Sequence, residues 1–201
     1  MQQQTIVACA LAVAALTTAP PLGTKAQTEP GSAANTAQLV DPGFESFKLS
    51  RAPSAGWYSD DVNPNEPQNA LVTMTPDNQT RVEGQYSLRI EQVRPRPRGQ
   101  AFLSQAVSLS KQGGNRSFDL SMQMRGRLTG PITIHVYVWS GNIAKIIGQR
   151  EAQVNMEWSK TSLSFRVPNG YDSFGIWIYL PRDYEALVWL DDIRLLASKK
   201  N

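Results

Sequence analysis

Apolar and polar residues alternate along most of the chain from Leu39 onward, which is the pattern of strands that bury one face. The clearest alternating runs are Phe118–Arg125, Ile132–Trp139, Leu163–Val167 and Phe174–Leu180. Leu88–Ile90 adds a shorter run, and Leu187–Leu196 is more continuously apolar, as expected of a strand buried on both faces. Turn residues bound these runs, and none shows the period of an amphipathic helix. The pattern predicts an all-β domain.

A turn signal separates two of the runs. Leu128-Thr129-Gly130-Pro131 predicts that Phe118–Arg125 and Ile132–Trp139 form an antiparallel hairpin. At least eight strands at such spacing indicate a β-sandwich, most simply a jelly roll. No segment repeats at a fixed period and no second boundary is visible. We therefore expect one β-sandwich over residues 39–197, followed by a polar tail at 198–201.

The residues before the domain have a different character. Ile6–Leu16 is an apolar run that is shorter than the about 20 residues needed to span a bilayer. Small residues at Thr24 and Ala26 suit cleavage before Gln27, so residues 1–26 are expected to be a signal peptide. Residues 27–38 are small and polar and read as a disordered leader. The chain is expected to be secreted or periplasmic, without a transmembrane segment.

The amino-acid composition excludes several kinds of functional site. The chain has 1 Cys and 1 His, so an intrachain disulfide, a cysteine-based zinc site and a two-histidine centre are excluded. That cysteine, Cys9, falls within the expected signal peptide. The formal net charge of +3 is too small to indicate nucleic acid.

Large aromatic residues occupy the polar parity of two runs. His135, Tyr137 and Trp139 alternate with aliphatic residues, and so do Trp177 and Tyr179. Aromatic rings stack on the C–H face of a sugar, while polar side chains bond its hydroxyls. If the third strand, Phe118–Arg125, lies in the same sheet, its outward residues join them. The predicted ligand-binding residues are then Asp119, Gln123, Arg125, His135, Tyr137, Trp139, Trp177 and Tyr179. The alternative, that these aromatics are covered as a second small core, stays open.

Six segments taken in order resemble one family, the carbohydrate-binding modules of the family 4, 9 and 22 type, which are galactose-binding-like jelly rolls. The segments are Leu39–Glu45, Glu83–Ile90, Leu103–Leu109, Phe118–Arg125, Trp158–Val167 and Trp189–Leu195. In the family's pattern the first of these is an opening strand. The resemblance covers about residues 39 to 197 and implies a glycan-binding sheet face. Because related sandwiches share these segments, it does not specify the ligand.

The same resemblance implies a structural calcium ion, held by the opening glutamate and the closing aspartate, which map onto Glu45 and Asp191. Asp191 also shares the parity of Ile193 and Leu195, an unusual place for an unpaired carboxylate. Carboxylates from the two ends of the domain would then tie its termini together through the ion. The alternative is that Asp191 caps a backbone turn or pairs with an arginine.

Two functions stay open at this point. The first is non-catalytic binding of a polysaccharide or oligosaccharide; the second is a structural or assembly role in the cell envelope, with a protein partner on the same face. Arg94, Arg96 and Arg98 in a proline-rich loop, with Arg89, Arg125 and Arg127 nearby in sequence order, raise the further hypothesis of an acidic glycan. The favoured alternative is a solvated loop between strands. An enzyme is not expected, because Asp119 is the only carboxylate on the proposed face. His135 and Tyr137 are the nearest approach to the acid/base pair of a polysaccharide lyase.

Overall fold

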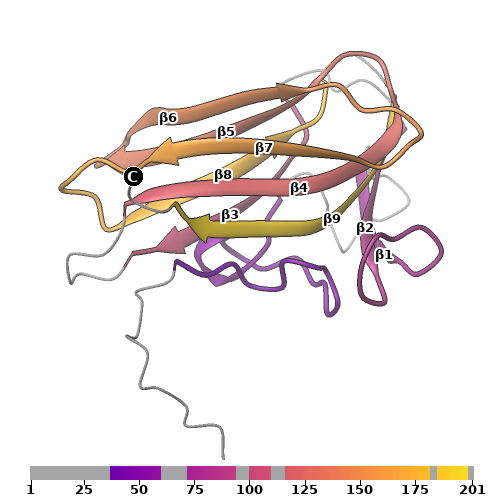
Figure 1. The fold of residues 1–201 in the computed structure, drawn as a ribbon, viewed down its shortest axis with the longest axis horizontal. Coiled ribbons are helices and arrows are strands. Elements are labelled where there is room, and N and C mark those ends of the chain that lie inside the picture. The colour runs from indigo at the N-terminus through magenta and orange to yellow at the C-terminus, as the bar shows by residue number, and fades with distance from the viewer. Residues whose placement is uncertain (1–36, 60–71, 94–99, 110–115, 182–184, 199–201) are drawn as a thin grey trace, which may run out of the picture. The chain divides into compact units, whose positions relative to one another are not determined.

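Two antiparallel sheets pack face to face in the computed structural model, which describes residues 37–59, 72–93, 100–109, 116–181 and 185–198 (Figure 1). The strands in these residues are β1 (Val72–Asp77), β2 (Ser87–Gln92), β3 (Phe102–Ser108), β4 (Ser117–Leu128), β5 (Ile132–Ser140), β6 (Ile143–Ala152), β7 (Ser159–Arg166), β8 (Ser173–Tyr179) and β9 (Ala186–Ala197). One sheet has the order β1-β2-β9-β4-β7 and the other the order β3-β8-β5-β6. The predicted all-β sandwich is confirmed.

The core lies between the sheets, where the apolar parity of each strand meets. Phe118 on β4, Phe165 on β7 and Phe174 on β8 form one aromatic cluster, with ring centroids 5.2 to 5.7 Å apart. These rings come from both sheets and join them. Period-two alternation makes this possible, because it sends every second side chain of a strand to the same face.

The N-terminal segment closes one side of the core without forming a strand. Residues 39–47 are bends and turns, so the family's opening strand is not present here as a strand. Phe44 and Trp57 are fully buried, their rings 5.5 Å apart, and the Trp57 indole N–H donates to the Asp41 carbonyl at 3.0 Å. Gln105 of β3 holds the segment further through side-chain bonds to the Val40 backbone, at 2.7 and 3.1 Å. Side-chain bonds thus replace strand pairing.

The predicted hairpin of β4 and β5 is wrong. The two strands follow one another in the chain but belong to different sheets, so the Gly130-Pro131 turn carries the chain from one layer of the sandwich to the other. The same turn residues suit a hairpin within one sheet and a crossover between two sheets. Gly130 takes a positive φ of 95°, and Pro131 precedes the new strand. Turn residues mark where a strand ends, and the partner of the next strand is set by packing.

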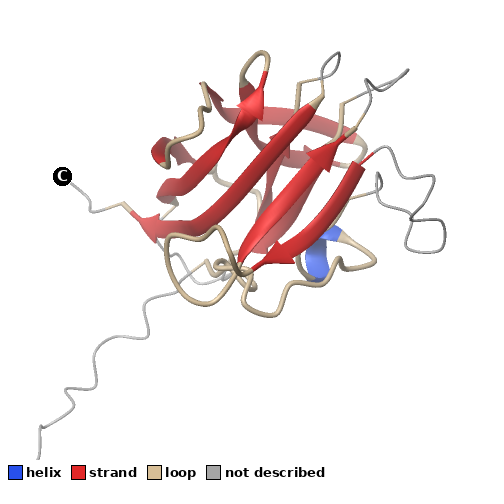
Figure 2. Cartoon of the chain, turned by 90° about the vertical axis from the view of Figure 1, so that its right-hand side faces the viewer, coloured by secondary structure: helices blue, strands red, loops and turns tan. Residues whose placement is uncertain are grey.

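Regular helix is minimal in the described part of the chain. The 3-10 turn Pro53–Ala55 lies beside the sandwich, and no described helix has the length and apolar character to cross a membrane (Figure 2). All described residues fall within one unit, Ala33–Asn201, and Ala37 at the end of the expected leader is buried against its core. The expected signal peptide, residues 1–26, lies outside the described residues.

Candidate functional site

The outer face of the four-stranded sheet carries a continuous layer of ring side chains. We call it the aromatic platform; its residues are Tyr58, Phe102, His135, Tyr137, Trp139, Trp177 and Tyr179. The ring centroids of Phe102 and Trp177 are 4.5 Å apart, those of Trp177 and Tyr179 are 5.9 Å apart and nearly parallel, and those of Tyr137 and Trp139 are 5.9 Å apart. The rings therefore touch in sequence across β3, β8 and β5.

Strand register brings these rings together. Trp177 of β8 lies opposite Ser104 of β3 on one side and His135 of β5 on the other. Tyr179 lies opposite Phe102 and Thr133 in the same way. Directly opposite residues of an antiparallel pair share a face, so residues that are far apart in sequence form one surface.

A glycine makes room for the most exposed ring. Gly175 of β8 is paired with Tyr137, and a Cβ placed on it would lie 2.5 Å from Cη2 of Trp139 and 3.1 Å from Nε1 of Trp177. Any larger residue would push these indoles off the sheet. The missing side chain lets two tryptophans lie against the backbone.

The platform contains a short polar relay. Nδ1 of His135 and the Tyr137 hydroxyl are 2.7 Å apart, and that hydroxyl is 3.5 Å from the hydroxyl of Tyr179. Burial lowers the pKa of His135, because a charged imidazole would lose its hydration. Burial and the Tyr137 hydroxyl raise the pKa of Tyr179 above its usual range. His135 and Tyr179 are therefore neutral near pH 7, and with the Tyr137 hydroxyl they provide hydrogen-bond donors and acceptors suited to hydroxyl groups.

The platform is partly open to solvent. Trp139 is 38% exposed, whereas Phe102 is 8% exposed and contacts the rings of Tyr58, Trp177 and Tyr179. Tyr137, Trp177 and Tyr179 are half-buried through contacts with one another. In the described part of the chain the platform is thus a packed layer with an exposed indole, which differs from a fully covered small core.

Three residues predicted on this face are elsewhere. Asp119, Gln123 and Arg125 lie on β4, and β4 belongs to the five-stranded sheet. They point outward as expected, but to the opposite outside of the sandwich, so the prediction that they share a face with the aromatics is wrong. The error follows from the hairpin that was expected between β4 and β5.

Two of these β4 side chains, Asp119 and Arg125, contact neighbouring side chains. The Asp119 carboxylate accepts bonds from the hydroxyls of Ser164 at 2.6 Å and Ser198 at 2.8 Å, which lower its pKa. The Arg125 guanidinium lies 5.9 Å from the ring centroid of Trp189 on β9. They stabilise the outer surface of their own sheet.

The two carboxylates assigned to calcium do meet in space. Glu45 and Asp191 line one pocket of about 350 Å³, together with Glu83 and Asp192. Backbone N–H groups of residues 82–86 donate to both Glu45 and Asp191. Among the described residues, no three acidic, His or Cys side chains are placed to hold a metal ion. Calcium binding stays a prediction of the resemblance.

Sequence reasoning missed two platform residues. Phe102 begins β3 in the outward parity, and the inward residues Leu103 and Val107 of the same strand could have revealed it. Tyr58 lies in a loop and reaches the platform through an isolated backbone bridge to Ser104. No alternation marks it, so no sequence signal was available.

Comparison with solved structures decides the fold. The chain matches a CBM4 structure at 10% identity over 75% of this chain and 92% of that one, with a TM-score of 0.54. It matches the CBM22-1 xylan-binding domain from Paenibacillus barcinonensis at 15% identity over 84% of this chain and 100% of that one, with a TM-score of 0.55. The fold is the jelly roll of carbohydrate-binding modules. No family model matches the chain, and a comparison with curated proteins finds no match either.

The same jelly roll also occurs inside a larger protein. The chain matches the enzymatically active domain of tailspike protein 4 from bacteriophage CBA120 at 13% identity, with a TM-score of 0.57. The match covers 79% of this chain but 21% of that one. At such identities the likeness concerns the jelly roll alone, and function has to be argued from the platform.

Proposed function

We propose that the domain binds a polysaccharide or oligosaccharide, without catalysis, on the aromatic platform. The observation that carries the proposal is the unbroken ring contact from Phe102 to Trp139 across the outer face of one sheet, with the Trp139 indole exposed. Burying about 50 Å² of apolar surface per stacked sugar ring contributes roughly 1 kcal/mol. The hydroxyls of Tyr137 and Tyr179 supply the polar contacts. The jelly-roll neighbours named for carbohydrate binding support the proposal.

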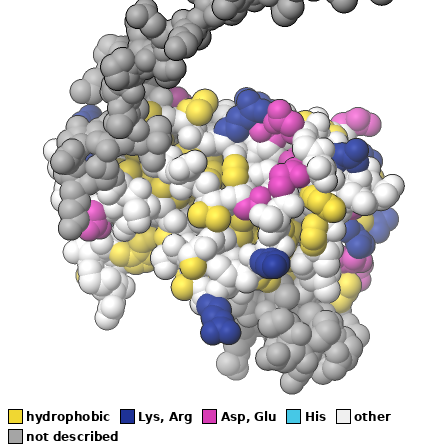
Figure 3. Space-filling model, turned by 90° about the horizontal axis from the view of Figure 1, so that it is seen from below, with side chains coloured by type: hydrophobic (Ala, Val, Ile, Leu, Met, Phe, Trp, Pro, Cys, Tyr) yellow, Lys and Arg dark blue, Asp and Glu magenta, His cyan; other side chains and the backbone are white. Residues whose placement is uncertain are grey.

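The chemistry of the platform favours a neutral glycan. None of its seven residues is Lys, Arg, Asp or Glu, and the residues paired beside them include Ser104, Gly175 and Gln149. The acidic-glycan hypothesis depended on Arg94, Arg96 and Arg98, which lie outside the described residues. On the face drawn in Figure 3, basic side chains lie beside acidic ones at several places. A uronate polymer and its carboxyl-reduced form, compared in one assay, separate the two classes.

Non-catalytic binding fits the same surface. Hydrolysis of a glycosidic bond by the usual route uses two carboxyl groups, and the platform has none. His135 and Tyr137 could exchange a proton at 2.7 Å, so a lyase is the catalytic alternative to test. Unsaturated products of a lyase absorb in the ultraviolet, and we expect no such absorbance with any polymer that the protein binds.

Affinity electrophoresis against a broad panel of neutral and acidic polysaccharides tests the proposal. At least one neutral polymer should retard the wild-type protein, and Trp139→Ala and Trp177→Ala should each weaken retention about fivefold or more. Gln123→Ala, a half-buried residue on the opposite sheet, is the matched control and should bind as the wild type does. If no glycan is bound, or if Gln123→Ala weakens binding as much, the platform is not a glycan site. Binding of a protein partner at the cell envelope would then be the favoured function of this face.

We also propose export of the chain, since the apolar run Ile6–Leu16 and the small residues at 24 and 26 fit a signal peptide. The mature protein is expected to begin at Gln27. Mass spectrometry of protein recovered from the periplasm or medium checks the new N-terminus. Intact Met1–Ala26 on the recovered protein would contradict the proposal.

A further inference from the structure

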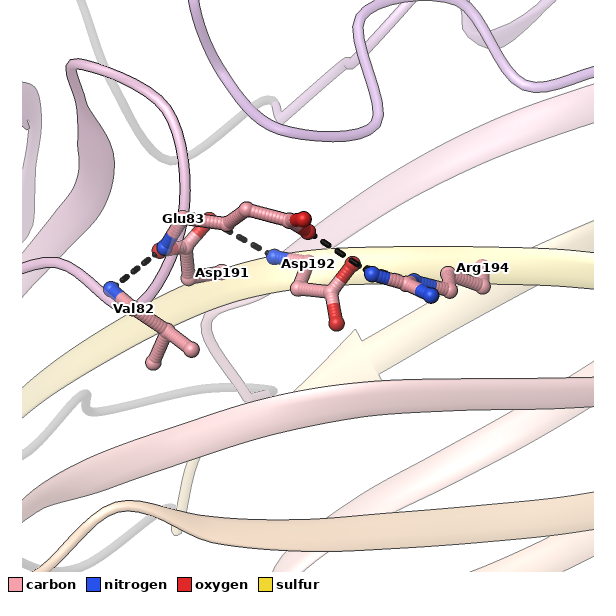
Figure 4. A network of polar contacts seen from close by, with 5 residues as sticks. All are labelled: Val82, Glu83, Asp191, Asp192 and Arg194. Carbon is pink, nitrogen blue, oxygen red and sulfur yellow. Dashed lines mark hydrogen bonds and ion pairs between the residues drawn. The ribbon is translucent and has the colours of Figure 1, made fainter.

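Four acidic side chains gather at the middle of β9, at the pocket that Glu45 and Asp191 share. They come from three parts of the chain: the opening segment, the turn before β2, and β9 itself. Figure 4 shows the β9 residues beside the turn. We call this cluster the carboxylate latch; it consists of Glu45, Glu83, Asp191, Asp192, Arg194 and the backbone of residues 82–86.

Asp191 is the buried centre of the latch. The residue is 1% exposed, and its carboxylate accepts three backbone N–H bonds (Figure 4). Oδ2 accepts from Val82 at 2.7 Å and Glu83 at 3.1 Å, and Oδ1 accepts from Asp192 at 2.7 Å. Both lone pairs of Oδ2 are therefore used by donors of the turn. Such bonds stabilise a carboxylate as a charged group without any cation.

Glu45 binds the other half of the same turn. Its two carboxylate oxygens both lie 3.0 Å from the backbone nitrogen of Gln85. The carboxylate rests directly on Gly84, where a Cβ would be 1.8 Å from Oε1, and Gly84 has a positive φ of 62°. A residue with a side chain would be strained at this φ and would push the Glu45 carboxylate away from the turn. The turn is shaped to present its N–H groups to two carboxylates.

Arg194 supplies the positive charge. Its Nε donates to Asp192 at 2.5 Å and its NH2 group donates to Glu83 at 2.7 Å, so one guanidinium joins the two remaining carboxylates (Figure 4). The planar guanidinium suits two acceptors at fixed angles. All four carboxylates of the pocket thus have a partner within the described chain.

This set does not fit a calcium site. Calcium takes six to eight oxygen ligands at about 2.3–2.6 Å. Here amide N–H groups point at the two carboxylates that would bind the ion, and the positive end of an amide dipole repels a cation. The other two carboxylates are held by a side chain that already carries a positive charge. To bind at Glu45 and Asp191, calcium would have to compete with the backbone N–H groups of Val82, Glu83 and Gln85 for these carboxylates.

We infer that the latch is metal-free: the turn before β2 joins the opening segment to β9 in place of a structural calcium ion. The turn bonds Glu45 and Asp191 through its backbone N–H groups, and Arg194 bonds it to Asp192 through Glu83. The inference differs from what the family resemblance implies. It is also independent of the proposed function, because the platform lies on β3, β5 and β8 and the latch on β9.

Thermal unfolding and calorimetry test the inference on the wild-type chain. The Tm after treatment with a chelator should equal the Tm in about 1 mM calcium chloride, and titration with calcium should release no saturable heat. A site with a dissociation constant near 1 μM would instead raise the Tm by several degrees at that concentration. A rise of that size, or a saturable heat, overturns the inference and supports calcium.

A variant pair tests the role of Arg194. Arg194→Gln removes the guanidinium from two carboxylates, whereas Arg89→Gln breaks the single pair with Glu91, 2.5 Å apart and similarly exposed, elsewhere on the same sheet. Arg194→Gln should lower the Tm by more than Arg89→Gln does. Equal shifts would show that Arg194 is an ordinary surface ion pair and would overturn its part in the latch. Both variants should keep the glycan binding of the wild type, which separates failure of the latch from failure of the platform.

Discussion

The indole of Trp139 lies over the backbone of Gly175 on the neighbouring strand, where a Cβ would come within 2.5 Å of Cη2. Nε1 of Trp177, two residues further along β8, lies 3.1 Å from the same Cβ position. The position of both indoles therefore depends on residue 175 being a glycine. A small change at residue 175 alters the platform without touching any ring.

Gly175→Ala is expected to weaken glycan binding about fivefold, because the new methyl group lifts Trp139 away from the sheet and misaligns its face with the ligand. Retention in affinity electrophoresis and a changed tryptophan fluorescence spectrum measure the two effects. Gln123→Ala, on β4 of the opposite sheet, is the control. Full binding by Gly175→Ala would show that Trp139 does not need its present position.

The lowered pKa of His135 leads us to expect that the stability of the fold depends on pH. Burial lowers the pKa of the folded imidazole below about 6.5, so the unfolded chain takes up a proton first as the pH falls. The contribution of the neutral His135 imidazole to the free energy of unfolding is fully present above about pH 6.5. It is lost as the pH falls through the lower pKa of the folded state. The free energy of unfolding should therefore decline between about pH 7 and pH 5.

His135→Gln isolates this effect, because the chain has 1 His. Urea unfolding at several pH values should show a shallower decline for His135→Gln than for the wild type over that interval. Identical curves would mean that carboxylates, and not the imidazole, set the dependence.

Asp191→Asn is expected to destabilise the domain by about 2–3 kcal/mol, since an amide NH₂ group would face donors that now find a carboxylate. Asp119→Asn, whose carboxylate is exposed and bonded to two serine hydroxyls, should cost less than about 1 kcal/mol. Chemical denaturation gives both values. Equal losses would contradict the central place of Asp191 in the latch.

Trp57 is expected to stabilise the core and to take no part in glycan binding. Trp57→Ala should cost about 3–5 kcal/mol, because the ring is 2% exposed and packs on Phe44. Trp57→Phe keeps most of the packing and loses the bond to the Asp41 carbonyl, so its cost should be about 1 kcal/mol. Denaturation curves measure the losses, and Trp57→Phe should still bind the glycan. Loss of binding by this variant would place Trp57 at the ligand.

Alternation predicted much of the fold, since it reports directly which side chains are buried. It identified the regions of β4, β5, β7, β8 and β9, and it placed His135, Trp177 and Tyr179 on an outward face. β6 was missed because it lies at a sheet edge, and its first residues, Ile143 among them, are exposed whether apolar or polar. Edge strands carry little burial signal, so the pattern is weak there.

Strand partners could not be predicted in the same way. Asp119, Gln123 and Arg125 have the correct parity, but parity is defined within a strand and does not say which sheet the strand joins. The Gly84 turn is a similar case: the pairing of its backbone N–H groups with Glu45 and Asp191 depends on contacts 40 and 108 or more residues apart in the chain. Such long-range contacts leave no local pattern.

The strand order also sets how the domain must fold. Among the described strands, the paired strands β1–β2 and β5–β6 are consecutive in the chain. By contrast, β9 lies between β2 and β4 and so joins the β1–β2 pair to the β4–β7 pair. Contacts between distant segments slow folding, and all-β sandwiches fold on the millisecond to second scale for this reason. During synthesis, the β1–β2 hairpin and the β4–β7 pair have no common partner until Ala186–Ala197 has left the ribosome. Completion of the five-stranded sheet is therefore a late event, and truncation before β9 should leave two exposed sheet fragments prone to aggregation.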